Sequence, residues 1–404
     1  MKVTIKKCKP IGMVSAPPSK SMAHRLILCC ALSGGESTVK NVTLSEDVKA
    51  TLRCITALGA KYEIHGDELK IVGTDVALSA PEAALDCGES GSTLRFFVPL
   101  AWVSGNRFEF TGAKSLMNRP QSEYEAICKK QGVRFKLGDN YILTKGKMTG
   151  GSFTVSGNVS SQFISGLLFA LPLLDGDSEI RILPPVESKP YIDMTIDTLK
   201  LFGVSVTRES LTEIKIPGGQ RYASGSFSVE GDYSNAAFFD ALNYLGGDVK
   251  VTGLDENSRQ GDKQYIEMFK ALDSSMPKIN LADCPDLGPI AFALAAKKNG
   301  AAFTGIRRLR LKESDRIAAM ASELAKLGVQ CDISDDDIVV HGGGITAPTE
   351  ALDSHNDHRV AMALSVLLCS VGGTLDGAQA VNKSMPDFFD RLKSLGVSAK
   401  ITQE

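Results

Sequence analysis

Basic side chains recur at one kind of position in this 404-residue chain, at or beside the start of a strongly apolar stretch. In the segment PPSKSMAHRLILCCALSGG, residues 17–35, Lys20 and Arg25 stand with no Asp or Glu among them. An isolated Lys or Arg near a helix start is usually solvated or paired with a local carboxylate. A set of such cations without acidic neighbours instead favours a bound polyanion, so we expect ligand to balance Lys20 and Arg25.

The other cations of this set occur at similar apolar segments or in loops beside them. They are Arg95, Arg119, Lys189, Lys312, Arg316, Arg359 and Lys383. Two carboxylates accompany them, Asp286 in CPDLG and Glu313 in RLKESDR. A carboxylate among cations either organises ion pairs or acts as a general acid or base, and the spacing leaves both roles open.

The apolar stretches predict buried helices, because they are apolar on nearly every side. Their expected starts are Ser21, Ser92, Ser160 with Ser161, Ser234, Asp286 and Asp357. Ser and Asp are typical N-cap residues, and a helix N-terminus offers free N–H groups and the positive end of the dipole. Several such ends facing one cleft would form an anion site.

A second series of segments predicts amphipathic helices that stop at a fixed point and continue into β-like sequence. The stops are Gly59, Gly132, Gly203, Asp273, Gly328 and Gly396, at steps of 73, 71, 70, 55 and 68 residues. Gly after the last helical turn is the usual left-handed cap. The two series together predict six repeated α/β units, of which one has lost a connector near residues 273–286.

The chain begins in the middle of a unit. The residues after Gly396, joined to those before Ser21, have the length of one ordinary connector, so the two ends should complete one unit together. This implies a discontinuous first domain of residues 1–17 plus 231–404 and a second domain of residues 18–230, with three units in each. The crossings are expected near 17–18 and 229–233, and a chain of this length suits two domains.

Composition excludes several classes of protein. The 45 basic and 47 acidic residues nearly balance, which argues against a nucleic acid or a membrane surface as partner. The nine scattered cysteines include no C-x-x-C, which favours reduced thiols in the cytoplasm over disulfides or a zinc site. His355 and His358 lack the spacing of metal ligands, and GESGSTLR lacks the ending of a P-loop. We therefore expect a cytoplasmic protein with no metal and no cofactor.

The residues resemble the enolpyruvyl transferase family along the whole chain. The motifs that carry the resemblance occur in the family's order: SKSMAHR, SGSTLRF, NRP, SSQF, SKPYID, VEGDYS, QGD, KESDR, NDHRVAM and KSMPDFF. The resemblance implies an α/β (α+β) fold of two similar domains, each with three βαβαββ-type units around buried helices. This arrangement is an inside-out α/β barrel with the active site in the interdomain cleft.

Within the family, the chain is most similar to the branch that acts on shikimate 3-phosphate and is a target of glyphosate. The implied reaction transfers the enolpyruvyl group of phosphoenolpyruvate to the 5-hydroxyl of shikimate 3-phosphate, with release of phosphate, in the chorismate pathway. Both substrates are small anions, which suits the cations, and the protein is expected to be a monomer.

The resemblance also assigns roles to residues. Lys20, Asp286 and Glu313 match the catalytic group, in which Asp286 handles the hydroxyl proton while Glu313 and Lys20 serve C3 and the leaving phosphate. The positions that match the shikimate 3-phosphate site are Lys20, Ser21, Arg25, Ser160, Ser161, Ser188, Tyr191, Asp286 and Lys312. The positions that match the phosphoenolpyruvate site are Lys20, Gly91, Arg119, Gln162, Arg316, Arg359 and Lys383.

Some residues depart from the family pattern. Glu89 stands where many members have a neutral residue, and Phe96 replaces a common Pro, so the response to glyphosate stays open. The nearest alternative function is transfer to UDP-N-acetylglucosamine, but that branch carries a reactive Cys where residues 113–126 have none, and Cys128 suits packing. A non-catalytic clamp around DNA is disfavoured because the cations gather with Asp286 and Glu313 and the net charge is -2.

Overall fold

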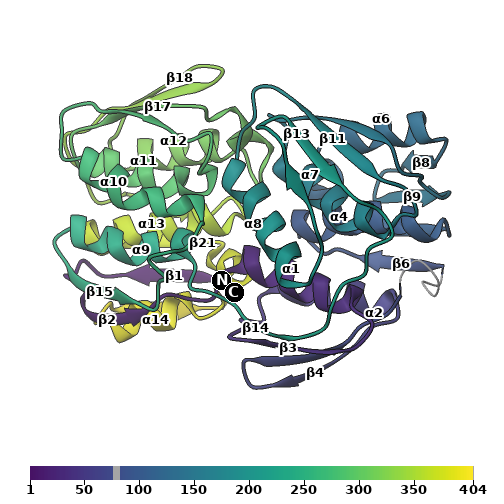
Figure 1. Cartoon of the computed structure of the whole chain (residues 1–404). Coiled ribbons are helices and arrows are strands. Elements are labelled where there is room, and N and C mark those ends of the chain that lie inside the picture. The colour runs from purple at the N-terminus through teal and green to yellow at the C-terminus, as the bar shows by residue number, and fades with distance from the viewer. Residues whose placement is uncertain (76–81, 404) are drawn as a thin grey trace. The chain divides into compact units, whose positions relative to one another are not determined.

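The computed structural model describes residues 1–75 and 82–403, in which helices and strands alternate along the chain (Figure 1). By its internal contacts the chain divides into two compact units. We call Met1–Pro17 with Gly231–Glu404 the split unit and Pro18–Glu230 the continuous unit. The mixed α/β fold expected from the sequence is confirmed, and among the described residues the strands form six separate sheets.

The continuous unit repeats one motif three times: two parallel strands with a buried helix, then a second helix and an antiparallel strand pair. The first repeat contains α1 (Lys20–Leu32), β3 (Glu36–Lys40), α2 (Glu46–Ala57), β4 (Lys61–His65), β5 (Glu68–Val72) and the returning strand β14 (Ser226–Ser228). The second contains β6 (Ala83–Asp86), α4 (Gly91–Ser104), β7 (Phe108–Thr111), α5 (Lys114–Met117), α6 (Ser122–Gln131), β8 (Arg134–Leu137) and β9 (Tyr141–Lys145). The third contains β10 (Ser152–Ser156), α7 (Ser161–Ala170), η1 (Leu171–Leu173), β11 (Ser178–Leu183), α8 (Lys189–Leu201), β12 (Thr207–Arg208) and β13 (Glu213–Ile216).

The split unit uses the same motif. Its first repeat contains β2 (Ile11–Ser15), α9 (Tyr233–Tyr244), β15 (Asp248–Thr252), η2 (Gly261–Gln264) and α10 (Tyr265–Ala271). The second contains β16 (Lys278–Asn280), η3 (Pro285–Leu287), α11 (Gly288–Lys297), β17 (Ala301–Thr304), η4 (Arg307–Leu311), α12 (Arg316–Lys326), β18 (Cys331–Ile333) and β19 (Asp337–Val340). The third contains β20 (Leu352–Asp353), α13 (His358–Val371), β21 (Gly373–Asp376), η5 (Ala378–Lys383), α14 (Phe388–Ser394), β22 (Ala399–Thr402) and β1 (Lys2–Ile5).

The first repeat of the split unit is shorter than the others. Its sheet has two strands, β2 and β15, whereas the other five sheets have four. After α10 the chain enters β16, the first strand of the next repeat, without an intervening strand pair. This repeat therefore lacks a strand pair near residues 273–286, where the sequence indicates a lost connector.

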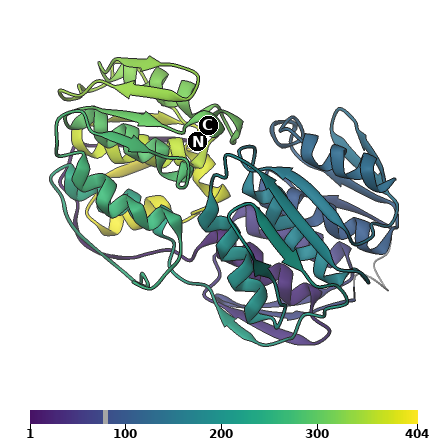
Figure 2. The same ribbon diagram turned by 45° about the horizontal axis from the view of Figure 1, so that its top comes forward.

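The two ends of the chain complete one sheet. β1 pairs antiparallel with both β21 and β22, and Val3 lies opposite Leu375 and Ile401. Both chain ends accordingly lie side by side in both views (Figures 1 and 2). β1 and β22, from the two ends of the chain, are therefore neighbours in one sheet.

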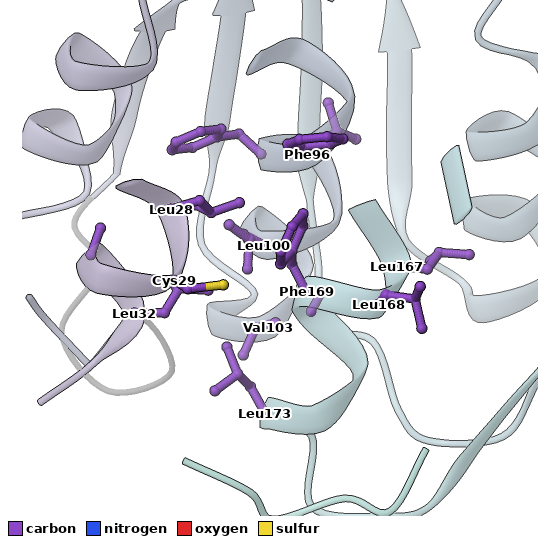
Figure 3. Close-up of a cluster of buried hydrophobic side chains, with 14 of the residues drawn as sticks. Leu28, Cys29, Leu32, Phe96, Leu100, Val103, Leu167, Leu168, Phe169 and Leu173 are labelled. Atoms are coloured by element: carbon purple, nitrogen blue, oxygen red, sulfur yellow. The ribbon is translucent and has the colours of Figure 1, made fainter. Parts of the chain in front are cut away.

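Helices with few polar side chains form the centre of each unit. In the continuous unit, Leu28 of α1, Phe96 of α4 and Phe169 of α7 are buried in one cluster (Figure 3). The rings of Phe96 and Phe169 have centroids 5.1 Å apart. Burial of each such side chain contributes about 1.5–3 kcal/mol, so the positions of these helices are strongly determined by packing. In the split unit α9, α11 and α13 are buried in the same way.

The glycines at which the sequence predicts the ends of surface helices have the backbone conformation expected of a helix cap. All five glycines have positive φ, for example +70° at Gly132 after α6 and +83° at Gly328 after α12. A side chain at such a backbone conformation would be strained, which explains the choice of Gly.

All nine cysteines are free thiols. Within the described residues, no helix is both long and apolar enough to cross a bilayer.

Candidate active site

The N-termini of the buried helices are capped by side chains, in several cases two residues earlier than expected. Ser19, Ser90 and Asp232 cap α1, α4 and α9, where the sequence pointed to Ser21, Ser92 and Ser234. Ser160 and Asp357 cap α7 and α13 as expected. In S-x-S segments the first Ser becomes the cap, and the second lies inside the first turn. The predicted polar residues therefore lie at helix N-termini, where free N–H groups favour anions.

Asp286 is an exception among the expected helix starts. It lies in the short 3-10 turn η3, and α11 begins two residues later, at Gly288. Its carboxylate contacts cations of the split unit.

Lys20 is the first residue of α1 and has a carboxylate partner. Its Nζ atom lies 2.7 Å from Oδ2 of Asp47, and both side chains are largely buried. The expectation that ligand alone balances Lys20 is therefore wrong. Asp47 lies in the first turn of α2, more than 25 residues away in sequence, so a search of local neighbours could not find it.

Arg25 differs from Lys20, because no carboxylate among the described residues contacts its guanidinium. Arg25 donates to Thr195 Oγ1 at 2.9 Å and to the carbonyls of Ser21 and Tyr191 at 2.7 and 3.0 Å. The Phe96 ring lies under it, 5.3 Å from the guanidinium carbon to the centroid. Burial lowers the pKa of Arg25 to about 10. A buried cation held by neutral dipoles favours an anionic ligand nearby.

Arg25 also connects the helices that carry the predicted shikimate 3-phosphate residues. Ser160 and Ser161 lie at the start of α7, and Ser188 and Tyr191 lie at the start of α8. Ser188 is buried and has a φ of +52°, which is uncommon for a residue with a side chain. Non-Gly residues held in this region often mark functional sites.

Three predicted phosphoenolpyruvate residues of the continuous unit converge at the start of α4. A Cβ atom on Gly91 would lie 2.8 Å from Nη1 of Arg119 and 3.3 Å from Oε1 of Gln162. Gln162 is fixed between Arg95, which donates to Oε1 at 2.8 Å, and Ser92, which accepts from Nε2 at 3.0 Å. The Nε and Nη2 atoms of Arg119 are buried and have no hydrogen-bond partner among the described residues. The arrangement thus offers unused guanidinium donors beside a residue without a side chain.

Asp286 lies among three cations of the split unit. Its carboxylate oxygens are 3.1 Å from Lys312 Nζ, 3.0 Å from Arg316 Nη1 and 3.5 Å from Arg359 Nη2. Burial alone would raise the pKa of Asp286, but the three cations together hold it well below its usual range. Asp286 is thus an ion-pair organiser in this state of the protein.

The ammonium group of Lys312 loses its proton at a lower pH than that of an exposed lysine. Burial lowers its pKa to about 8, and the Asp286 carboxylate opposes part of that effect. The charge of this predicted shikimate 3-phosphate ligand can therefore change in mildly alkaline solution.

Glu313 is oriented by two groups that were not predicted as its partners. His358 Nδ1 lies 2.6 Å from Oε2 of Glu313, and Arg316 Nη2 lies 3.8 Å from the same oxygen. Arg316 in turn makes a two-pronged contact with Asp357, at 2.8 Å and 3.3 Å. The NDHR motif contains His358 and Asp357, but no local pattern indicates their contact with Glu313 and Arg316.

Glu313, Asp357 and His358 also bring three possible metal ligands within 4.8 Å of one another. The guanidinium of Arg316 contacts both carboxylates, so it supplies the positive charge that a metal ion would otherwise bring. These residues therefore fit an arginine-centred ion network better than a metal site.

Arg359 and Lys383 complete the predicted phosphoenolpyruvate set of the split unit. Arg359 donates through Nη2 to Ser234 Oγ at 2.7 Å, while its buried Nε and Nη1 atoms have no hydrogen-bond partner among the described residues. Burial lowers the pKa of Arg359, but the carboxylates of Asp286 and Asp232 raise it by more. The guanidinium therefore stays charged. Lys383 Nζ donates to the carbonyl of Asn356 at 2.5 Å. As in the continuous unit, an arginine retains donors for a ligand.

Comparison with known proteins agrees with this chemistry. A family model described as EPSP synthase (3-phosphoshikimate 1-carboxyvinyltransferase) matches residues 6–392. The 3-phosphoshikimate 1-carboxyvinyltransferase of Clostridium novyi is 39% identical over 420 residues, covering 95% of each chain, and that of Clostridium perfringens is 39% identical over 417 residues, covering 98% of each. A solved structure of EPSP synthase from Acinetobacter baumannii matches with a TM-score of 0.81 and 25% identity over 100% of both chains. The chain therefore belongs to the EPSP synthase, or 3-phosphoshikimate 1-carboxyvinyltransferase, family.

Proposed function

We propose that this enzyme transfers the enolpyruvyl group of phosphoenolpyruvate to the 5-hydroxyl of shikimate 3-phosphate, in the chorismate pathway. Membership of the family over nearly the whole chain carries the proposal. The cations described above support it, because each substrate carries both a phosphate and a carboxylate. Among the residues that the structure describes, the partners of Arg25 are neutral, and Arg119 and Arg359 each have buried donors without a partner.

The reaction requires three proton transfers, from the 5-hydroxyl, to C3 and from the resulting methyl group, and stabilisation of a phosphate leaving group. Addition joins the 5-hydroxyl oxygen to C2 of phosphoenolpyruvate while C3 gains a proton and becomes a methyl group. Elimination then breaks the bond between C2 and the phosphate oxygen and removes a proton from the methyl group. The products are the enolpyruvyl ether and inorganic phosphate, and no electrons are exchanged with an external oxidant or reductant.

We assign the hydroxyl proton to Asp286. The cations around Asp286 make it a weak base before substrates bind. Anionic substrates would draw on the same cations, so their binding raises the basicity of this carboxylate when the hydroxyl is in place. Asp286 therefore changes from ion-pair organiser to general base on substrate binding.

We assign protonation of C3 to Glu313 and assistance of the leaving phosphate to Lys20. His358 orients Glu313 through the 2.6 Å contact and offers a route by which its proton is replaced. Lys20 is held by Asp47, so its ammonium is placed before phosphate charge develops. The residues proposed for the two substrates come from both units, and we propose that the two sets act on one pair of substrates.

Phosphate release from phosphoenolpyruvate tests the proposed function. With no metal added, the enzyme is expected to release phosphate when shikimate 3-phosphate is present and to remain silent with UDP-N-acetylglucosamine. Release only with the nucleotide sugar would overturn the assignment, and silence with both acceptors would show that residues such as Glu89 have altered the chemistry.

We also place the enzyme in the cytoplasm as a monomer. The nine free thiols support a reducing compartment. Sedimentation of the purified enzyme at several concentrations tests the monomer, and a mass twice that of the chain would contradict it.

A further inference from the structure

The helix α2 contributes no residue to either predicted substrate site, yet it contacts α1 beside the catalytic group. Asp47 lies 2.7 Å from Lys20, and Thr51 Oγ1 lies 2.7 Å from His24 Nδ1. Asp47 and Thr51 are one turn apart on α2, and Lys20 and His24 are one turn apart on α1. Residues at this spacing share one face of a helix, so the two contacts form a ladder between the helices.

The ladder continues into α4. Thr51 Oγ1 lies 2.8 Å from Thr93 Oγ1, and Thr93 Oγ1 donates to Ser90 Oγ at 2.7 Å. Ser90 caps α4 by accepting from the Thr93 backbone N–H, and Gly91 follows it directly. His24, Thr51, Thr93 and Ser90 are each at most 1% exposed. One buried chain of hydrogen bonds thus joins the helix that begins with Lys20 to the helix that begins with Gly91.

The hydroxyl protons along this chain of hydrogen bonds determine which ring nitrogen of His24 carries a proton. Each hydroxyl has one proton to donate. Thr93 donates its proton to Ser90, so Thr51 must donate to Thr93. His24 Nδ1 must then donate to Thr51, which leaves Nε2 without a proton. In agreement, burial lowers the pKa of His24 to about 3, so the ring is neutral at physiological pH.

We propose that α2 positions Lys20 and Gly91 through this ladder, with His24 held as the neutral Nδ1–H tautomer. His24, Thr51 and Thr93 are positioning residues that act through Ser90, Gly91 and α1 and do not touch substrate. The effect of the ladder on turnover rests on the function proposed above, whereas the tautomer and the hydrogen bonds do not.

The first test observes the histidine directly and does not depend on activity. In enzyme labelled with ¹⁵N-histidine, long-range ¹H–¹⁵N correlation shows which ring nitrogen of His24 carries the proton, and His24→Asn assigns its signal. We expect the proton on Nδ1 and no titration between about pH 5 and 8, because the folded pKa is about 3. A proton on Nε2, or titration in this range, would overturn the proposal.

The second test separates positioning from general destabilisation with a matched pair of variants. In His24→Asn, the amide nitrogen can take the place of Nδ1 and still donate to Thr51, whereas His24→Leu removes the donor. We expect His24→Leu to lower kcat/KM for phosphoenolpyruvate about tenfold, the order expected for a lost buried hydrogen bond, with the KM for shikimate 3-phosphate changed less than about twofold. His24→Asn should restore most of the loss, and equal activity of the two variants would refute the ladder.

Further variants keep the test decisive if His24→Leu does not fold. Thr93→Val breaks the same ladder while keeping the shape of the side chain, and it should produce the same selective loss. Thr56→Val is the control on α2, because Thr56 Oγ1 donates to the carbonyl of Leu52 in its own helix and, within the described residues, to no other helix. Equal losses in Thr93→Val and Thr56→Val would contradict the proposal. If the wild-type enzyme shows no activity with shikimate 3-phosphate, the proposed function fails while the tautomer measurement still decides the ladder.

Discussion

Replacement of Gly91 by Ala tests how closely the start of α4 approaches the phosphoenolpyruvate residues. The added Cβ would lie 2.8 Å from Arg119 Nη1, whereas ordinary contacts begin at 3.4 Å. The guanidinium must therefore retreat by about 0.6 Å, because the backbone of α4 is fixed by its buried side chains. Gln162 Oε1, at 3.3 Å, needs to move far less.

The displacement of Arg119 should weaken its proposed contact with phosphoenolpyruvate. A hydrogen bond to a charged group contributes about 1.5–3 kcal/mol, so partial loss of one raises the KM for phosphoenolpyruvate roughly tenfold. We expect the KM for shikimate 3-phosphate to change little, because its predicted ligands lie on α1, α7 and α8 in this unit.

Steady-state phosphate release at saturating shikimate 3-phosphate measures the effect. Gly34→Ala is the matched control, because a Cβ there would meet nothing within 4 Å and Gly34 does not have a positive φ. A KM for phosphoenolpyruvate within about twofold of wild type in Gly91→Ala, or an equal rise in Gly34→Ala, would refute the reasoning.

Three further predictions concern charge. Glu313→Gln and Lys20→Met should each lower kcat at least about a hundredfold without a change in the circular dichroism spectrum, and near-normal turnover would remove that residue from the catalytic group. Binding of shikimate 3-phosphate should weaken above about pH 8 as Lys312 loses its proton, and calorimetry should find this dependence absent in Lys312→Arg. His24 has a pKa of about 3 when folded and about 6.5 when unfolded, so below pH 6.5 the unfolded chain binds the extra proton and stability falls. Between pH 7 and 5 this loss is about 2 kcal/mol in urea titrations, and wild type losing no more than His24→Asn would contradict it.

The repeat pattern was predictable from sequence because it depends on local signals. Gly132 and Gly328 ended helices where the apolar periodicity stopped, and their positive φ values explain why Gly is required. The short interval from Asp273 to Asp286 indicated a lost connector, and the structure has no strand pair between α10 and β16. Counting connector lengths led to the expectation that the two ends of the chain complete one unit, and in the structure β1 pairs with β22.

The side-chain partners were less predictable, because tertiary packing decides them. Asp47 neutralises Lys20 from a different helix, and nothing in the residues around Lys20 indicates this contact. The spacing of His358 argues against a metal ligand and indicates no other partner, whereas the fold places it against Glu313. Sequence patterns find groups that share a chemical type, but they do not show which partners meet between helices.

Deuterium incorporation tests the central claim, that the enzyme works by addition and elimination, most directly. When the reaction runs in D₂O, C3 of phosphoenolpyruvate gains a solvent-derived deuteron and becomes a methyl group, from which one hydrogen is then lost. Mass spectrometry should therefore find deuterium in the methylene group of the enolpyruvyl product, with one phosphate released per product. A product formed at full rate without deuterium would contradict a methyl intermediate and the acid role proposed for Glu313.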